Sequence, residues 1–269
     1  AEMELAVGRP VKALALAEHY NRSGTNQHRM CSVLLRSLSA AKRHGECADE
    51  AKRHYDLYSD DSSTWSDVAE ELIAGGSHQA AGLIIDALPS TDETATSLAI
   101  LKATSFLRQG RPELAVTAAR PHALNGAADA NLILASAYHQ IGQYSSALSL
   151  INVGEFGAKD EFFLLRGDIY RDLGCYSRAE QQYRQLQNAS KGSLALGRLY
   201  QSIGSFDKAA ELAMHALHSD RRDVNAWMLY LQAVRSNKGI EAAIEDCNLH
   251  IAQENSKLIE AVLRQTLGM

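Results

Sequence analysis

The chain has 269 residues, of which 46% are hydrophobic and 22% are charged, and its formal net charge at pH 7 is -5. This composition is ordinary for a globular protein, and the slight acidity argues against the broad basic surface with which nucleic-acid-binding proteins attract phosphates. The longest apolar stretches, such as residues 80–88, are far shorter than the roughly 20 residues needed to cross a bilayer, so we expect no nucleic-acid partner and no membrane span.

The first residues match the second half of a helical hairpin. Gly8 supplies a turn, Pro10 suits the first turn of the helix that follows, and Ala13 is a small packing residue. The helix that should precede this turn is missing or vestigial, so we predict a half repeat over residues 1–25 and interpret the chain as part of a longer protein. An incomplete first hairpin also leaves apolar surface open, which would allow self-association.

Beyond the half repeat, a glycine followed five residues later by an alanine recurs at a nearly constant period. From Ala51 to Ala243, successive alanines are 30 to 34 residues apart. The pairing of Gly45 with Ala51 and of Gly239 with Ala243 is looser than the rest. The strict pairs are Gly76/Ala81, Gly110/Ala115, Gly142/Ala147, Gly174/Ala179 and Gly204/Ala209.

The residues before each glycine have the periodicity of a helix. Leu134, Ala135 and Tyr138, for example, share one stripe with the i, i+3, i+4 spacing of an amphipathic helix. A glycine with positive φ ends such a helix, and a small alanine lets a second helix pack closely against the first. Each period therefore predicts a helix-turn-helix hairpin, and a regular array of them indicates a stack of like units rather than one globular core.

We expect one all-α domain over residues 1–269, built from about seven and a half such hairpins. The terminal segment 256–267, polar on one side and apolar on the other, is predicted to be a capping helix. The complete hairpins are predicted over residues 27–59, 62–92, 95–126, 128–158, 160–189, 190–221 and 224–254.

The residues at fixed positions of these hairpins resemble the tetratricopeptide repeat (TPR) family. The matching sets are Trp65, Ala69, Leu72, Gly76 and Ala81; Phe163, Gly167, Tyr170, Gly174 and Ala179; and Leu196, Gly197, Tyr200, Gly204 and Ala209. The proline that closes the family's repeat is mostly absent, which leaves the turns between hairpins undetermined. The resemblance implies a right-handed α-solenoid superhelix of antiparallel hairpins that acts as a protein-protein interaction scaffold or adaptor, with no catalytic activity of its own.

Sequence motifs that indicate catalysis, cofactor binding or metal binding are weak throughout the chain. It has no phosphate-binding loop, no dinucleotide-binding glycine motif, no H-E-x-x-H and no G-x-S-x-G. His215 and His218, and Cys247 and His250, have spacings that could hold a metal, but the sequence fixes no third ligand, and we interpret them as an exposed helix face and as packing residues. We therefore expect no cofactor and no metal. The alternative is that the chain is the partner-recruiting arm of a larger enzyme, such as a transferase, whose catalytic domain lies elsewhere.

The four cysteines lie far apart in sequence and include no C-x-x-C pair. In a chain of this length they are not typical of a disulfide framework. They therefore favour a reducing compartment such as the cytoplasm.

The resemblance also implies where a partner would bind, because in this family the first helix of each hairpin lines a concave groove. Arginine forks pair with carboxylates, so Arg171, Arg198 and Arg235 are expected to orient a peptide segment or a partner protein. The lysine and asparagine pairs with which some members clamp an acidic C-terminus are not present. The expected groove residues are Glu70, Thr104, Ser136, His139, Leu164, Asp168, Arg171, Leu194, Arg198, Gln201, Met228, Gln232 and Arg235.

Overall fold

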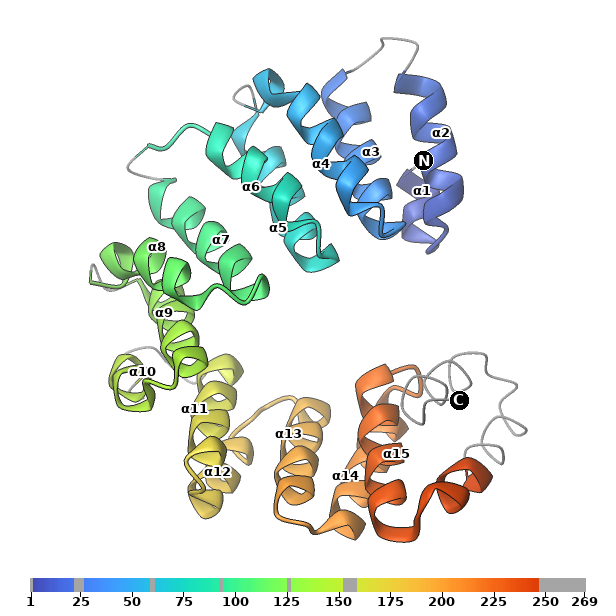
Figure 1. Cartoon of the computed structure of the whole chain (residues 1–269), viewed down its shortest axis with the longest axis vertical. Helices are drawn as coiled ribbons and strands as arrows, with labels where there is room; N and C mark the ends of the chain where they lie inside the picture. Colours follow the sequence, from blue (N-terminus) through green and yellow to red (C-terminus); the bar gives the residue numbers. More distant parts are fainter. Residues whose placement is uncertain are drawn as a thin grey trace. The chain divides into compact units, whose positions relative to one another are not determined.

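The computed structural model describes residues 2–21, 27–58, 61–91, 94–124, 127–151 and 159–246, and in these ranges every regular element is a helix. The chain divides into two compact units, Ala1–Leu150 and Ile151–Met269, which we call the N-terminal unit and the C-terminal unit. Within each unit, helices adjacent in sequence pack against each other as antiparallel pairs (Figure 1). The all-α class and the repeated helical hairpin are therefore confirmed.

The N-terminal unit begins with a five-residue helix, α1 (Glu2–Ala6), packed on α2 (Pro10–Asn21). Met3, Val7 and Val11 of this first pair are exposed apolar residues. The hairpins that follow are α3 (Gln27–Ala40) with α4 (His44–Arg53), α5 (Ser62–Gly75) with α6 (His78–Ala87), α7 (Ala95–Arg108) with α8 (Pro112–Leu124), and α9 (Ala128–Ile141) with α10 (Tyr144–Leu150). A short 3-10 helix, η1 (Tyr55–Leu57), follows α4.

The C-terminal unit repeats the same arrangement. Its helices are α11 (Asp160–Asp172) with α12 (Tyr176–Tyr183), α13 (Ala189–Ser202) with α14 (Phe206–Ser219), and α15 (Val224–Lys238), which is followed by helical residues 240–246. The side chains of Asn188 and Asp223 accept backbone hydrogen bonds at the starts of α13 and α15 and so define where these helices begin. The predicted capping helix over 256–267 lies outside the described residues, as do Cys247 and His250.

The turn within a hairpin usually depends on a left-handed glycine. Gly142 follows α9 with φ of 82°, and its backbone N–H donates to the carbonyl of His139, which closes the end of the helix. The α3–α4 turn is different. There the positive φ, 62°, belongs to Lys42, and Gly45, the glycine that the period aligned with this turn, lies inside α4.

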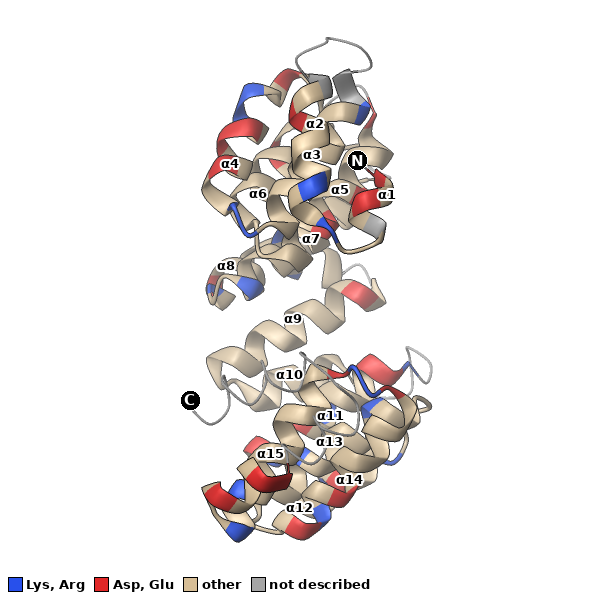
Figure 2. Ribbon diagram, turned by 90° about the vertical axis from the view of Figure 1, so that its right-hand side faces the viewer, with Lys and Arg blue, Asp and Glu red and all other residues tan. Residues whose placement is uncertain are grey.

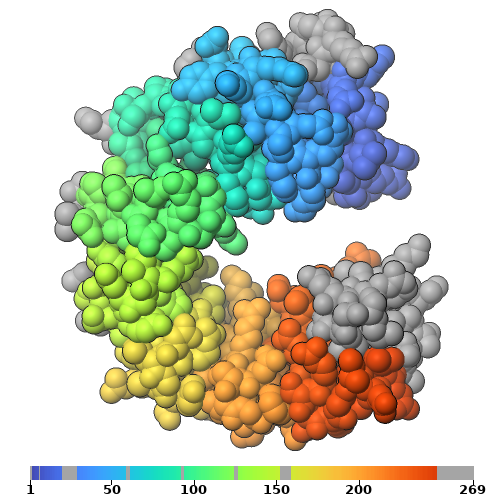
Figure 3. Space-filling model, in the orientation of Figure 1, coloured from blue at the N-terminus to red at the C-terminus, as the bar shows by residue number. Residues whose placement is uncertain are grey.

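The small residues of the repeat lie in the core. Ala81, Ala115, Ala147, Ala179 and Ala209 are fully buried, as expected if they let paired helices approach closely. Large side chains fill the remaining space. Among them are Trp65 and Tyr58, whose rings meet edge to face with centroids 4.6 Å apart. The space-filling view shows neighbouring hairpins in close contact within each unit (Figure 3).

The surface carries charges of both signs, interspersed over both units in the view of Figure 2. Such a mixture suits specific pairing with a partner better than long-range attraction of a polyanion. No helix in the described ranges is long and apolar enough to span a bilayer.

Candidate partner-binding surface

In each hairpin, the helix that comes first in sequence is called the first helix; these helices are α3, α5, α7, α9, α11, α13 and α15. The exposed side that the first helices of one unit form together is called the first-helix face of that unit. In the C-terminal unit, α13 and α15 contact each other directly. Gln201 Nε2 donates a hydrogen bond of 3.3 Å to Gln232 Oε1, so two residues 31 positions apart meet on this face. The sequence register had placed both of them in the groove, and the structure brings them together.

Two apolar groove residues precede these glutamines on the same helices: Leu194 lies two turns before Gln201, and Met228 lies one turn before Gln232. Leu194 on α13 and Met228 on α15 are half-buried, and both pack against the same core cluster around Trp227. Each side chain is therefore partly held by the core and partly available at the surface. Such residues can anchor an apolar side chain of a ligand without having to reorganise.

Asp168 and Arg171 are also on a first helix, but they bind each other. Arg171 Nη1 donates to Asp168 Oδ1 at 2.9 Å, and its Nε donates to Asp172 Oδ1 at 3.1 Å. Tyr183 Oη, which comes from α12, donates to Asp168 Oδ1 at 2.7 Å. A ligand carboxylate would have to displace these interactions to reach Arg171. Leu164, one turn before Asp168, is half-buried against the core of the same hairpin.

Unlike the guanidinium of Arg171, that of Arg198 is not paired with the carboxylate of any described residue. It is exposed on α13, one turn after Leu194, and has no ion pair or hydrogen bond to any residue that the structure describes. Arg235 is exposed on the last turn of α15, three residues after Gln232. On α13 a guanidinium therefore lies beside an apolar anchor and an amide, as recognition of an acidic peptide requires.

The four expected groove residues of the N-terminal unit are less available to a ligand. Glu70 is exposed on α5, whereas the hydroxyls of Thr104 and Ser136 donate to carbonyls of their own helices, at 2.7 Å and 2.8 Å. The ring of His139 lies against Tyr144, with centroids 5.8 Å apart. These side chains are therefore mostly occupied by local contacts.

The N-terminal unit has instead a hollow of about 430 Å³ between α1, α3 and α5, which sequence reasoning missed. One of its lining residues is Gly75, where an added Cβ would lie 2.3 Å from Ser39 Oγ, so glycine lets α5 approach α3 closely at this point. The double glycine Gly75-Gly76 was the available signal, because the turn needs only the second one. The lining residues are Glu2, Leu5, Arg36, Ser39, Ala40, Glu71, Leu72 and Gly75.

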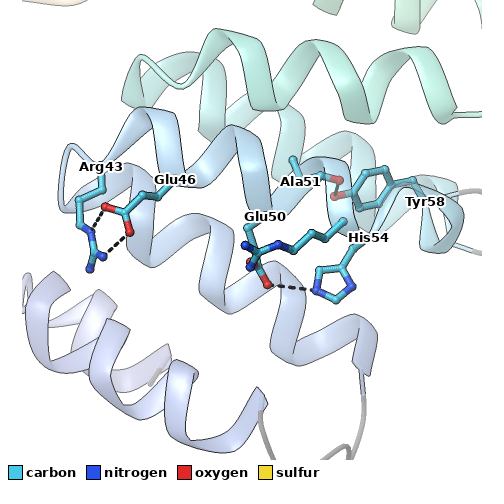
Figure 4. Close-up of polar contacts among 7 residues, drawn as sticks. Arg43, Glu46, Glu50, Ala51, His54 and Tyr58 are labelled. Atoms are coloured by element: carbon cyan, nitrogen blue, oxygen red, sulfur yellow. Dashed lines mark hydrogen bonds and ion pairs between the residues drawn. The ribbon is translucent and has the colours of Figure 1, made fainter.

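A second hollow, of about 260 Å³, lies between α2, α3 and α4 and is rich in carboxylates. Most of these are already paired. Glu46 binds the guanidinium of Arg43, which lowers the pKa of this glutamate, and Glu50 contacts both Arg53 and His54, at 2.8 Å and 3.1 Å (Figure 4). Nearby, Tyr58 Oη donates to the carbonyl of Ala51 at 2.7 Å. The arrangement is therefore mainly a network of polar contacts among the protein's own side chains.

The histidine pair of the sequence does not come together with further ligands. The Nδ1 atom of His215 lies 3.0 Å from the hydroxyl oxygen, Oγ, of Ser193. Within the described part of the chain, no group of three or more His, Cys, Asp or Glu side chains is placed to hold a metal ion.

Comparison with protein families gives one match. The family model described as tetratricopeptide repeat matches residues 100–159 and 194–256, that is, hairpins in both units. A comparison with curated proteins found no matching relative.

Solved structures similar to this chain share the same kind of fold. A thermophilic TPR protein of Thermus thermophilus superposes with a TM-score of 0.58 at 21% identity, over 65% of this chain and 99% of that protein. A tetratricopeptide repeat protein from Parabacteroides merdae gives 0.52 at 17%, over 76% and 84%. Yeast Tom70 gives 0.53 at 14%, over 96% and 59%. At such identities the likeness concerns the fold alone.

Proposed function

Because the chain belongs to the tetratricopeptide repeat family, we propose that it is a non-catalytic protein-interaction scaffold or adaptor whose first-helix faces hold a peptide segment or a partner protein. A stack of hairpins presents extended surface, and an open surface of this kind seldom shifts the pKa of a catalytic acid or base. Binding, rather than chemistry, is the function that such a surface supports.

The strongest support comes from the stripe on α13 and α15. Leu194, Arg198 and Gln201 follow one another at i, i+4 and i+7 on α13, so they share one side of the helix. Met228 and Gln232 form the matching pair on α15. Each glutamine amide keeps further donors or acceptors after making the Gln201–Gln232 bond, and these can bind the backbone of a peptide.

The proposal rests on the exposed guanidinium of Arg198. This group forms no ion pair with any residue that the structure describes, so it is ready to bind a carboxylate. The ligand that fits is a peptide with an apolar residue for the Leu194–Met228 surface and a nearby Asp or Glu for Arg198. The remaining expected groove residues of the C-terminal unit would extend this contact along the first helices of that unit.

The test is a selection from a random peptide library on the full chain, followed by affinity measurement on purified variants. Arg198→Glu should weaken the selected peptide by about tenfold or more, because a charge-assisted hydrogen bond is replaced by repulsion. Arg222→Glu, which changes an exposed arginine in the α14–α15 connection, is the matched control and should leave affinity unchanged. Circular dichroism should show equal helix content in both variants. Unchanged affinity in Arg198→Glu and in the double variant with Arg235→Glu would rule out this face.

A further inference from the structure

The hollow between α1, α3 and α5 has the size of a binding pocket. Its volume of about 430 Å³ lies within the range that ligand pockets usually have, about 300–1,000 Å³. For comparison, an apolar cavity of about 150 Å³ is enough to hold benzene. The hollow therefore has room for one large side chain together with part of the backbone that carries it.

Apolar residues from all three helices form part of its wall. Leu5 of α1 is half-buried and packs against the core of the N-terminal unit, and Leu72 of α5 is fully buried. Ala40, the last residue of α3, is exposed and so lies on the open side of the hollow. An apolar group that enters the hollow would therefore rest on residues that the fold already holds in place.

Gly75 is a departure from the repeat at one end of the hollow. It is the residue immediately before the left-handed turn glycine, Gly76, and the turn itself does not require a glycine there. In the other hairpins this position carries a side chain. The residues before Gly110, Gly142, Gly174 and Gly204 are Gln109, Ile141, Leu173 and Ile203.

The charged residues that line the hollow are already paired. Arg29 forms a fork with Glu2, in which its Nε donates to Oε1 at 2.9 Å and its Nη2 donates to Oε2 at 2.6 Å. Arg36 Nε lies 2.9 Å from Glu71 Oε2. Neither carboxylate is therefore waiting for a cation from a ligand.

These charges select an uncharged occupant. Glu2 and Glu71 would repel a further carboxylate, whereas Arg36 would repel a further cation. Lys42 adds to this repulsion of cations, because its Nζ donates to the carbonyl of Gly75 at 3.3 Å. A charged group would lose its hydration without gaining a free partner of opposite sign. An apolar group has no such cost.

The guanidinium of Arg36 favours an aromatic ring over an aliphatic side chain. A cation within about 6 Å of the centre of a ring is attracted to the face of that ring. The same unit shows this contact within its own fold, since the guanidinium of Arg111 lies 5.8 Å from the ring centroid of Phe106. The volume of the hollow also suits a ring better than a leucine-sized group.

We propose that this hollow is a pocket for one aromatic side chain of a peptide ligand, with the ring on Leu5, Ala40 and Leu72 and its face toward Arg36. The inference rests on the proposed function in one respect, that the ligand is a peptide. It concerns the other unit, however, and a residue without charge, whereas the surface around Arg198 was proposed for an apolar residue beside an Asp or Glu.

The test maps the site directly with a photoreactive aromatic amino acid. The full chain is irradiated with N-acetyl-4-benzoylphenylalanine amide, and the adducts are located by mass spectrometry after digestion. We expect adducts on the residues of α1, α3 and α5 that line the hollow. Adducts confined to Leu194 and Met228 would place the aromatic residue on the C-terminal unit and overturn the proposal.

Competition tests the chemical class of the occupant. N-acetyltryptophanamide should suppress the adducts in the hollow at a concentration at least about tenfold lower than the corresponding derivatives of lysine and glutamate, since only the aromatic derivative is uncharged. If either charged derivative competes as well as the tryptophan derivative, the hollow does not select an apolar group and the proposal is wrong.

Protein variants provide an independent check. Ala40→Trp fills the hollow and should reduce its adducts by about tenfold. Ala15→Trp, the same substitution at an exposed position of α2 that does not line the hollow, is the matched control and should leave the adducts unchanged. Because both alanines are exposed, circular dichroism should show equal helix content. Adducts in Ala40→Trp at the level of the wild type would contradict the proposal.

Arg198→Glu separates this inference from the proposed function. It should leave the adducts in the hollow unchanged, because Arg198 lies in the C-terminal unit. Loss of the hollow adducts in Arg198→Glu would overturn the proposal. Failure of the hollow to react would in turn leave the effect of Arg198→Glu on a selected peptide intact, so the two proposals can fail separately.

Discussion

Tyr183 and Asp168 are joined across the α11–α12 hairpin by a hydrogen bond of 2.7 Å from the phenol to the carboxylate. Burial of the phenol, reinforced by the negative charge of Asp168, raises the pKa of Tyr183 far above its usual range. Tyr183 therefore keeps its proton at neutral pH and donates to Asp168. The bond holds the second helix of the hairpin against the first, next to the surface proposed for the partner.

Removing this bond should destabilise the C-terminal unit modestly. Tyr183→Phe keeps the ring and its packing but deletes the donor, and we expect a loss of about 1 kcal/mol in the free energy of unfolding. Arg171 still satisfies Asp168 in the variant, so the cost should not reach that of an unpaired buried charge. Urea unfolding followed by circular dichroism measures the difference. A variant as stable as the wild type would mean that the bond contributes nothing net.

Gly167 is required by the same tyrosine. A Cβ at this position would lie 2.3 Å from Tyr183 Cε1, so Gly167→Ala forces the ring out of its place against α11. We expect destabilisation of about 1–3 kcal/mol, the usual cost of overpacking a well-filled core.

Gly82 provides the matched control for Gly167, because it also lies within a helix, α6, but has open space where a Cβ would be added. Gly82→Ala should stabilise the chain by up to about 1 kcal/mol through helix propensity alone. Opposite signs for the two substitutions, measured in the same urea experiment, would confirm that the space at Gly167 is the cause. Equal effects would contradict it.

The hairpins were predictable because their signals are local and periodic. A turn glycine and a packing alanine recur in most repeats, and each reports a backbone or packing requirement that depends on few neighbours. The failure at Gly45 is instructive. In the α3–α4 turn, Lys42 takes the left-handed conformation, and its Nζ donates to the carbonyl of Gly75 at 3.3 Å, so a tertiary contact accompanies the conformation that glycine adopts in the other turns.

The sequence could predict which side of the helices forms the candidate surface, but not how the side chains on it pair. The register of the repeat placed Gln201 and Gln232 on the same side of neighbouring helices, and they do meet. It could not show that Arg171 is held by Asp168 while Arg198 is uncommitted, because ion pairing depends on side-chain directions rather than on spacing. For the same reason the hollow beside Gly75 escaped prediction, since its lining residues come from three helices that are separate in sequence.

Asp160 should make the contact between successive hairpins of the C-terminal unit dependent on pH. From the first turn of α11, its carboxylate accepts hydrogen bonds from the backbone N–H groups of Gln187 and Asn188, at 2.8 Å and 3.1 Å. These bonds lower its pKa below the usual aspartate value of 3.8. The stabilisation is therefore fully present above this value and is lost as the pH falls through the lower folded-state pKa.

The variant Asp160→Ala should accordingly unfold at a lower temperature than the wild type at pH 7, and the two midpoints should converge as the pH is lowered below about 4. Asp49→Ala is the control, because Asp49 is exposed on α4 and accepts no hydrogen bond from any described residue. Its midpoint should stay close to that of the wild type at each pH. A gap for Asp160→Ala that persists unchanged at low pH would show that the loss is due to packing rather than to the charge.

The cysteines should differ sharply in reactivity because only one of the described three is exposed. Cys175 lies at the surface of the α11–α12 turn, whereas Cys31 and Cys47 are buried between α3 and α4. Burial raises the pKa of Cys31 to about 12 and that of Cys47 to about 11, so neither forms a thiolate at neutral pH. In a Cys247→Ser background at pH 7.5 to 8, Ellman's reagent should titrate one thiol of the folded chain quickly and the other two only in denaturant. Rapid reaction of two or three thiols without denaturant would show that the α3–α4 hairpin opens readily, against the packing that the structure gives it.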